Sequence, residues 1–212
     1  MIAAGIDLSG RTTGTTAVAW VEGERPRLVE VVADRGLRDD AQLVSRCLDR
    51  DPDVIAIDAP LSLPHAVTCS NPDCPRCLAP DARYGSRAVD GRKAWAAVGH
   101  VEKAPMPTVM LAGIAFRAIY LRRLLERAGA QVIETWPMGT YRAVARADGV
   151  TDGDTGDSWR RRLLAARVGG LEGLEDGTDR LDAVAAAYAG WCRLTGRGTA
   201  ARAEDDEIWI GR

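Results

Sequence analysis

Two aspartates stand at the ends of short apolar runs, where a charged side chain has no structural use. Asp7 closes the run Ile2-Ala3-Ala4-Gly5-Ile6 and leads into a turn rich in glycine and threonine, and Asp58 closes the run Val54-Ile55-Ala56-Ile57. A core strand gains nothing from an ionised aspartate, and burying one without a partner costs several kcal/mol. We therefore expect both carboxylates to meet a metal ion or a phosphate-bound cation.

Three further acidic residues are expected at the same end of the molecule. Glu134 ends another strand-like run, and Asp179 and Asp182 stand three positions apart at the start of a helical pattern. Positions i and i+3 lie on the same side of a helix, so both aspartates can face the strand ends. Simpler roles stay open for three residues: Asp58 as a turn former, Glu134 as a surface residue, and Asp179 as a charge on the helix dipole. Asp7 and Asp182 are harder to explain in that way.

Carboxylates gathered at one place repel one another, raise each other's pKa values and destabilise the fold. Divalent cations remove this penalty, because Mg²⁺ and Mn²⁺ accept hard oxygen ligands. A pair of such ions can activate water and stabilise the leaving oxygen of a phosphodiester. The sequence offers no convincing Ser/His/Asp triad. Two-metal chemistry on a phosphodiester therefore matches these residue types.

The elements that would position these carboxylates can be read from the hydrophobic pattern. Three strand-like segments are followed by a helix, a fourth strand, an irregular segment, and then a helix, a fifth strand and two helices. Asp39 or Asp40 is the expected cap of the first helix, and Thr178 that of the last. A three-stranded meander followed by alternating helices and strands implies a mixed sheet with helices on its faces. The predicted strands are residues 2–8, 15–21, 27–33, 54–58 and 131–137, and the predicted helices are 39–50, 108–128, 158–168 and 179–194, with a short closing strand at 208–210.

Residues 64–107 have no sustained periodicity and form an expected insertion that carries a cluster of metal-ligand side chains. His65, Cys69, Cys74 and Cys77 fall within thirteen residues, and Cys74-Pro75-Arg76-Cys77 has the spacing of a zinc knuckle. Three thiolates and one imidazole make a closed tetrahedral set, which predicts structural Zn²⁺. His100 is a rival for the fourth ligand. Two alternatives stay open: three unligated thiols in a loop, or a redox role for the paired cysteines.

The bulk composition limits the class of protein. The chain has 212 residues, 46% of them hydrophobic and 27% charged, which fits one globular domain with an insertion. No apolar run reaches the roughly 18–20 residues that a membrane span requires. The N-terminus has no basic segment and meets Asp7 too early for a signal peptide, so we expect a cytoplasmic protein. Five cysteines, an odd number, argue against a disulfide framework.

Charge is unevenly distributed along the chain. The formal net charge is −2, but residues 76–127 contain ten Lys or Arg against four Asp or Glu. This local excess is either an ordinary solvated surface or a basic flank beside an acidic centre. On the second interpretation Arg83, Arg87, Arg92 and Lys93 could hold a phosphate backbone.

Four stretches of the chain resemble the ribonuclease-H-like superfamily, and within it a family of predicted nucleases known as a domain of unknown function (DUF429). The resemblance runs from Gly5 to Ile210, apart from residues 64–107, and rests on the order and spacing of these stretches. It implies a five-stranded mixed sheet and a divalent-metal site with Asp7, Asp58, Glu134 and Asp182 as ligands and Asp179 as an auxiliary. The stretches are Gly5-Ile6-Asp7, Ala56-Ile57-Asp58-Ala59-Pro60-Leu61, Glu134-Thr135-Trp136-Pro137 and Asp179-Arg180-Leu181-Asp182-Ala183-Val184-Ala185-Ala186-Ala187.

Three functions compete at this point. The favoured hypothesis is a nuclease that depends on Mg²⁺ or Mn²⁺ and acts on DNA, RNA or a hybrid. The second is an actin-like ATPase, because residues 5–14 also look like a phosphate-binding turn, although that group uses two such domains. The third is an adaptor with a vestigial acidic site.

Overall fold

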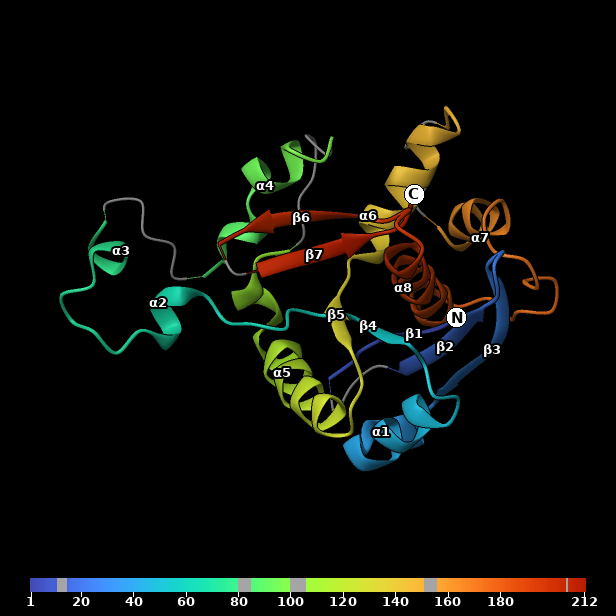
Figure 1. Cartoon of the computed structure of the whole chain (residues 1–212), viewed down its shortest axis with the longest axis horizontal. Helices are drawn as coiled ribbons and strands as arrows, with labels where there is room; N and C mark the ends of the chain where they lie inside the picture. The colour runs from blue at the N-terminus through green and yellow to red at the C-terminus, as the bar shows by residue number, and fades with distance from the viewer. Residues whose placement is uncertain (11–14, 80–84, 100–105, 151–155, 205) are drawn as a thin grey trace.

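The centre of the molecule is a five-stranded sheet with the strand order β3-β2-β1-β4-β5 (Figure 1). The computed structural model describes residues 1–10, 15–79, 85–99, 106–150, 156–204 and 206–212, apart from the side chain of residue 109. The first three strands form an antiparallel meander, whereas β4 runs parallel to β1 and β5 parallel to β4. This confirms the predicted five-stranded mixed sheet of an α/β protein. The strands are β1 (Ile2–Asp7), β2 (Thr16–Glu22), β3 (Arg27–Asp34), β4 (Val54–Asp58) and β5 (Val132–Glu134).

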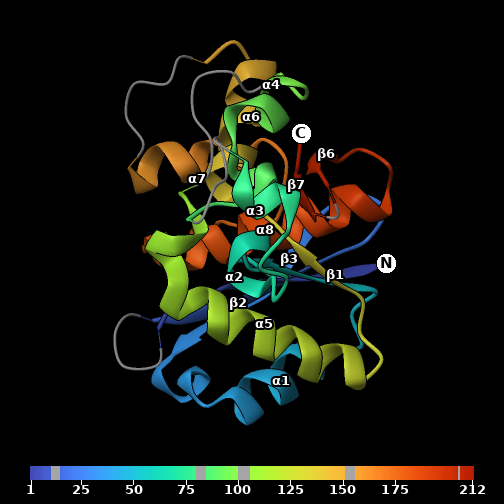
Figure 2. The same ribbon diagram turned by 90° about the vertical axis from the view of Figure 1, so that its left-hand side faces the viewer.

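Helices cover both faces of the sheet (Figure 2). On one face lie α1 (Asp40–Leu48) and α5 (Ala112–Arg127); on the other lies α8 (Thr178–Leu194), with α6 (Pro137–Ala147) and α7 (Asp157–Ala165) packed against it. Successive residues of a strand point to opposite faces. Ala4 and Ile6 therefore join the core under α1 and α5, whereas Ala3 joins the core under α8.

The insertion contains only short helices in its described part. Two of them, α2 (His65–Thr68) and α3 (Pro75–Leu78), lie far from the sheet in Figure 1. Nearer the sheet, η2 (Ala88–Asp90) and α4 (Arg92–Ala96) pack on a hairpin made of β6 (Thr199–Ala203) and β7 (Asp206–Ile210). The side chains of Val89, Trp95 and Ile208 fill this small third core. In the described part of the chain, no helix is both long enough and apolar enough to cross a membrane.

Several details differ from the sequence prediction, and the strand predicted at 131–137 is confined to Val132–Glu134. The helix predicted at 108–128 begins as a 3₁₀ turn, η3 (Thr108–Leu111), before α5. Helix α6 was not predicted, and the closing strand has a partner, β6, that was also missed. Gly177, and not Thr178, occupies the N-cap position of the last helix, which has no side-chain cap. The Thr178 hydroxyl donates instead to Asp157 Oδ1 at 2.8 Å. The predicted cap Asp39 is confirmed: its carboxylate accepts from the amides of Ala41 and Gln42 at 2.8 and 3.0 Å.

Candidate metal centre

Asp7 and Asp58 lie side by side at the carboxyl ends of two parallel strands. The β1–β4 register pairs Ala3 with Val54, Gly5 with Ala56, and Asp7 with Asp58. Paired residues of adjacent strands point to the same face, and Ala3, Val54 and Ala56 belong to the core under α8. Both carboxylates therefore leave the sheet on the α8 side.

Helix α8 lies unusually close to β1, and this brings its acidic first turns to the strand ends. A Cβ atom on Gly5 would lie 2.1 Å from the Ala187 nitrogen and 2.2 Å from the Ala183 oxygen, both in the backbone of α8. Glycine at position 5 and small residues along α8 permit this approach. Asp182, and Asp179 one turn earlier, consequently stand beside Asp7 near the start of the helix.

The carboxylates of Asp7, Asp58 and Asp182 are buried near one another with too little positive charge to balance them, and their pKa values are raised. Burial, followed by the charges of Asp182 and Asp179, raises the pKa of Asp7 to about 8. Burial, followed by the charges of Asp7, Asp182 and Glu134, raises the pKa of Asp58 well above its usual value. Burial also raises the pKa of Asp182 to about 6, although the Arg160 guanidinium opposes this shift. A bound divalent cation would stabilise the ionised forms, as the ligand chemistry of Mg²⁺ and Mn²⁺ requires.

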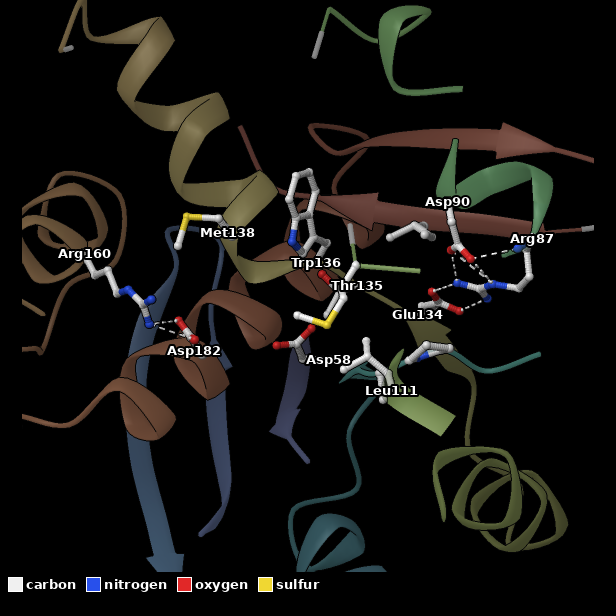
Figure 3. Close-up of a pocket in the computed structure, with 14 residues that line it drawn as sticks. Asp58, Arg87, Asp90, Leu111, Glu134, Thr135, Trp136, Met138, Arg160 and Asp182 are labelled. Atoms are coloured by element: carbon white, nitrogen blue, oxygen red, sulfur yellow. Dashed lines mark hydrogen bonds and ion pairs between the residues drawn. The ribbon is translucent and has the colours of Figure 1, made fainter. Parts of the chain in front are cut away.

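Glu134 is placed differently from the prediction. Its register partner on β4 is Ile57, so its side chain leaves the sheet on the face opposite to Asp58. Both of its oxygens are engaged: Oε1 accepts from Arg87 Nη2 at 2.6 Å, and Oε2 accepts from Arg87 Nη1 at 2.7 Å and from the Leu61 amide at 2.8 Å. Figure 3 shows Asp58 between Asp182 on one side and Glu134, with Arg87 and Asp90, on the other. Glu134 therefore ties the insertion to β5 through Arg87, and it lines the same pocket as Asp58 and Asp182.

The residues predicted to bind phosphate differ from one another in their exposure to solvent. Arg87 is only 4% exposed and forms a buried ion pair with Asp90 as well as with Glu134. An exposed contact with a phosphate backbone does not fit this burial. Arg92 and Lys93 are exposed at the start of α4. Arg83 lies outside the described residues.

A pocket of about 230 Å³ opens beside the strand ends. Its lining includes Asp58, Asp182 and Glu134, together with Arg87, Arg160, Trp136 and Met138 (Figure 3). The buried hydroxyl of Tyr141 interacts with Asp182, and burial, followed by the Asp182 charge, raises the pKa of this phenol.

Sequence reasoning missed Arg160 and Tyr141. Arg160 is one of three consecutive arginines in α7, and nothing in the pattern distinguishes it from Arg161 or Arg162. Tyr141 belongs to α6, the helix that was not predicted.

The four predicted zinc ligands do come together. His65, Cys69, Cys74 and Cys77 each offer one ligand atom, and these atoms all lie within 4.8 Å of one another. A tetrahedral site with Zn–S bonds of about 2.3 Å needs ligand atoms about 3.8 Å apart, so this spacing is close to a preformed site. His65 Nε2 lies 3.4 Å from Cys74 Sγ, and this hydrogen bond lowers the pKa of the Cys74 thiol to about 6. The rival ligand His100 lies outside the described residues.

The two clusters differ in how closely their ligand atoms are held. In the described part of the chain, Asp7, Asp58 and Asp182 do not reach the mutual spacing of the His65 cluster. Instead, Arg160 pairs with Asp182. The carboxylate site therefore already has a cation of its own beside it.

The fold and the carboxylates together define a class: an α/β protein with a five-stranded mixed sheet and an acidic centre at its strand ends. A family model described as "Protein of unknown function (DUF429)" matches residues 5–207, and the chain belongs to this family. No curated protein matches the chain.

Among solved structures, Thermus thermophilus RuvC is similar over most of both chains. One RuvC structure, in complex with a Holliday junction substrate, has a TM-score of 0.46, and a second has 0.47. In both cases the sequences are 16% identical, and the match covers 92% of this chain and 96% of the other.

Proposed function

We propose that this protein is a nuclease that hydrolyses phosphodiester bonds of nucleic acid with the help of Mg²⁺ or Mn²⁺. The observation that carries the proposal is the convergence of Asp7, Asp58 and Asp182 beside a pocket, with the pKa of each raised by burial. Such an arrangement is unfavourable for the metal-free fold, and a divalent cation is the ordinary way to stabilise it.

The residues present fit a hard divalent cation. Asp7, Asp58 and Asp182 are the proposed ligands, with Asp179 as an auxiliary charge, and all of them offer carboxylate oxygens. Glu134 is left out of the set because Arg87 and Leu61 already engage its oxygens. One or two bound ions would activate water and stabilise the leaving oxygen of a phosphodiester.

The chain's own residues position the proposed carboxylate ligands and exclude water from the pocket beside them. The strand register fixes Asp7 next to Asp58, and the first turns of α8 bring the charge of Asp182 near both carboxylates. Trp136 and Met138 form apolar walls of the pocket. Arg92 and Lys93, exposed on the adjacent insertion, are proposed to meet the phosphate backbone of the substrate.

We propose in addition that His65, Cys69, Cys74 and Cys77 bind one structural Zn²⁺. Four ligand atoms held within 4.8 Å of one another support this assignment, as does the thiolate-rich donor set. Metal analysis of the purified protein tests it, and less than about half an equivalent of zinc per chain would discard it.

A cleavage assay tests the nuclease proposal. Single-stranded, duplex, hybrid and junction substrates are incubated with Mg²⁺ or Mn²⁺ and with the wild-type protein, Asp7→Asn or Asp58→Asn. The control variant is Asp51→Asn, because Asp51 is exposed and its φ of 47° is one that asparagine also tolerates. We expect Asp7→Asn and Asp58→Asn to lower cleavage by about a hundredfold or more, and Asp51→Asn to leave it unchanged.

Other outcomes would redirect the proposal. Cleavage that survives in Asp7→Asn would point to a contaminant or a different site. No cleavage of any substrate, with an ATP-dependent shift in melting temperature, would favour the ATPase. No cleavage and wild-type behaviour of Asp7→Asn in cells would favour the adaptor.

A further inference from the structure

Arg160 brings a positive charge into the carboxylate centre from a separate helix. It projects from α7, and its Nη1 donates to both oxygens of Asp182, at 3.0 and 2.9 Å. The two side chains are only 13% and 16% exposed, so the pair is shielded from solvent. The guanidinium also lies 5.6 Å from the centre of the Tyr141 ring, which favours a cation on its face. Figure 3 shows the Arg160 side chain extended toward Asp182 at the edge of the pocket.

The charge of Arg160 acts on the whole group of carboxylates. It opposes the rise in the pKa of Asp7 and Asp58 as well as that of Asp182. Four aspartates at positions 7, 58, 179 and 182 carry up to four negative charges, and Arg160 supplies one positive charge among them. In the metal-free protein, Arg160 therefore neutralises part of the negative charge that a bound divalent cation would otherwise neutralise.

We propose that Arg160 is a resident counter-cation that a divalent ion must displace from Asp182, and that the displaced guanidinium then pairs with the phosphate of the substrate. The inference rests on the proposed function. Both oxygens of Asp182 accept from Arg160, so an ion that takes Asp182 as a ligand competes directly with this ion pair. A guanidinium suits both partners, because its planar fork matches carboxylate and phosphate alike.

The test measures the affinity for the ion separately from cleavage. Mg²⁺ binding is followed by calorimetry for wild type, Arg160→Gln and Arg162→Gln, at about pH 8.5, above the pKa of about 8 of Asp7. Arg162 is exposed on the same helix, so its variant makes the same change in net charge away from the pocket. We expect Arg160→Gln to bind Mg²⁺ roughly tenfold more tightly than wild type, and Arg162→Gln to bind it like wild type.

The second measurement is cleavage at saturating Mg²⁺ with the best substrate from the assay described above. We expect Arg160→Gln to be slower than wild type although it binds the ion more tightly, because it lacks the cation that meets the phosphate. A merely structural role would weaken both properties. Arg160→Lys keeps the charge but not the fork, and we expect it to restore the weaker ion affinity of wild type without full cleavage.

The outcomes separate the two proposals. Mg²⁺ binding to Arg160→Gln that is equal to or weaker than wild type would overturn the role of Arg160 and leave the nuclease proposal standing. Unimpaired cleavage by Arg160→Gln would overturn the phosphate contact. Absence of Mg²⁺ and Mn²⁺ binding to both wild type and Arg160→Gln would overturn the metal centre itself, and the role of Arg160 with it.

Discussion

At the scale of single residues, Asp7 serves the proposed chemistry at the expense of stability. Its pKa is raised from 3.8 to about 8 by burial and by neighbouring carboxylates, so ionisation is disfavoured in the folded protein. A raised carboxyl pKa stabilises the fold at low pH, and this contribution is lost as the pH rises from about 4 to about 8. Above about 8 the loss is complete, because Asp7 is then ionised in the folded and unfolded protein alike.

Asp7→Asn should therefore stabilise the metal-free protein while removing its activity. Asparagine does not ionise, so the variant avoids the loss of stability that Asp7 causes as the pH rises. Its stability advantage over wild type should grow between about pH 4 and pH 8 and then level off. Because Asp7 is partly accessible to solvent, we expect a gain of about 1–3 kcal/mol at the plateau. Thermal unfolding in a metal chelator at pH 4, 6 and 8.5, compared with wild type and Asp51→Asn, measures it. A constant difference at all three values would contradict the raised pKa.

The contrast between Asp58 and Glu134 shows what the sequence could and could not predict at this scale. Both residues end apolar strands, and both patterns predict a carboxylate at the edge of the sheet. The register of β4 and β5 decides the rest: Glu134 is level with Ile57 and not with Asp58, so it points to the other face. A shift of one residue inverts the face of every side chain in a strand, and no single-sequence pattern fixes that shift between distant strands.

At the scale of elements, the contact between β1 and α8 determines where Asp182 stands. Most of this contact could be predicted, because an alanine-rich helix next to a strand containing Gly5 indicates close packing. Helix α6 could not be placed so easily. Its apolar residues Met138, Tyr141 and Val144 have helical spacing, but Gly139 and Thr140 weaken its helix propensity. In addition, the predicted strand 131–137 included Pro137, the first residue of α6, so the start of this helix was assigned to the strand.

Gly5→Ala tests the role of this close contact. The new Cβ would overlap backbone atoms of α8, at 2.1 and 2.2 Å, and backbone cannot move aside as a flexible side chain can. We expect a loss of roughly 3 kcal/mol in the free energy of unfolding, together with weaker Mg²⁺ binding as Asp182 moves away from Asp7. Chemical denaturation and calorimetry measure the two effects.

Gly113→Ala is the matched control for that substitution. Gly113 lies in α5, and a Cβ there would meet nothing within 4 Å. Alanine should stabilise the helix by about 0.5 kcal/mol and leave metal binding unchanged. Equal stability of Gly5→Ala and wild type would show that α8 can shift away from β1 without cost.

At the scale of the whole molecule, two kinds of metal chemistry are proposed in separate parts of the chain. Oxygen ligands gather where strands and α8 meet, within a large core, whereas sulfur ligands gather in an insertion with little core. Composition predicted this division, because residues 64–107 lack a hydrophobic period but hold three of the five cysteines and both histidines. What the sequence could not show is the buried Arg87–Glu134 pair that ties the insertion to β5, because this pair joins residues 47 positions apart.

The segment that carries the proposed zinc site, residues 65–78, should fold and unfold independently of the sheet. Neither α2 nor α3 buries a side chain, so the ligand set is the main source of stability for this segment. Its ion pair with the hairpin, Arg76 to Glu204, joins half-exposed side chains and contributes little. Removal of zinc with a selective chelator, or Cys74→Ser, should therefore abolish hydrogen-exchange protection in peptides covering residues 65–78.

Peptides from β1, β4 and α8 should keep their protection in the same hydrogen-exchange experiment, because their amides lie in the two main cores. The control is Cys47→Ser, which replaces a buried core cysteine of α1 outside the ligand set. It should lower protection in α1 and leave residues 65–78 and their zinc content unchanged. Loss of protection throughout the sheet on removal of zinc would mean that the ion stabilises the entire chain, and the insertion would then be an integral part of the fold.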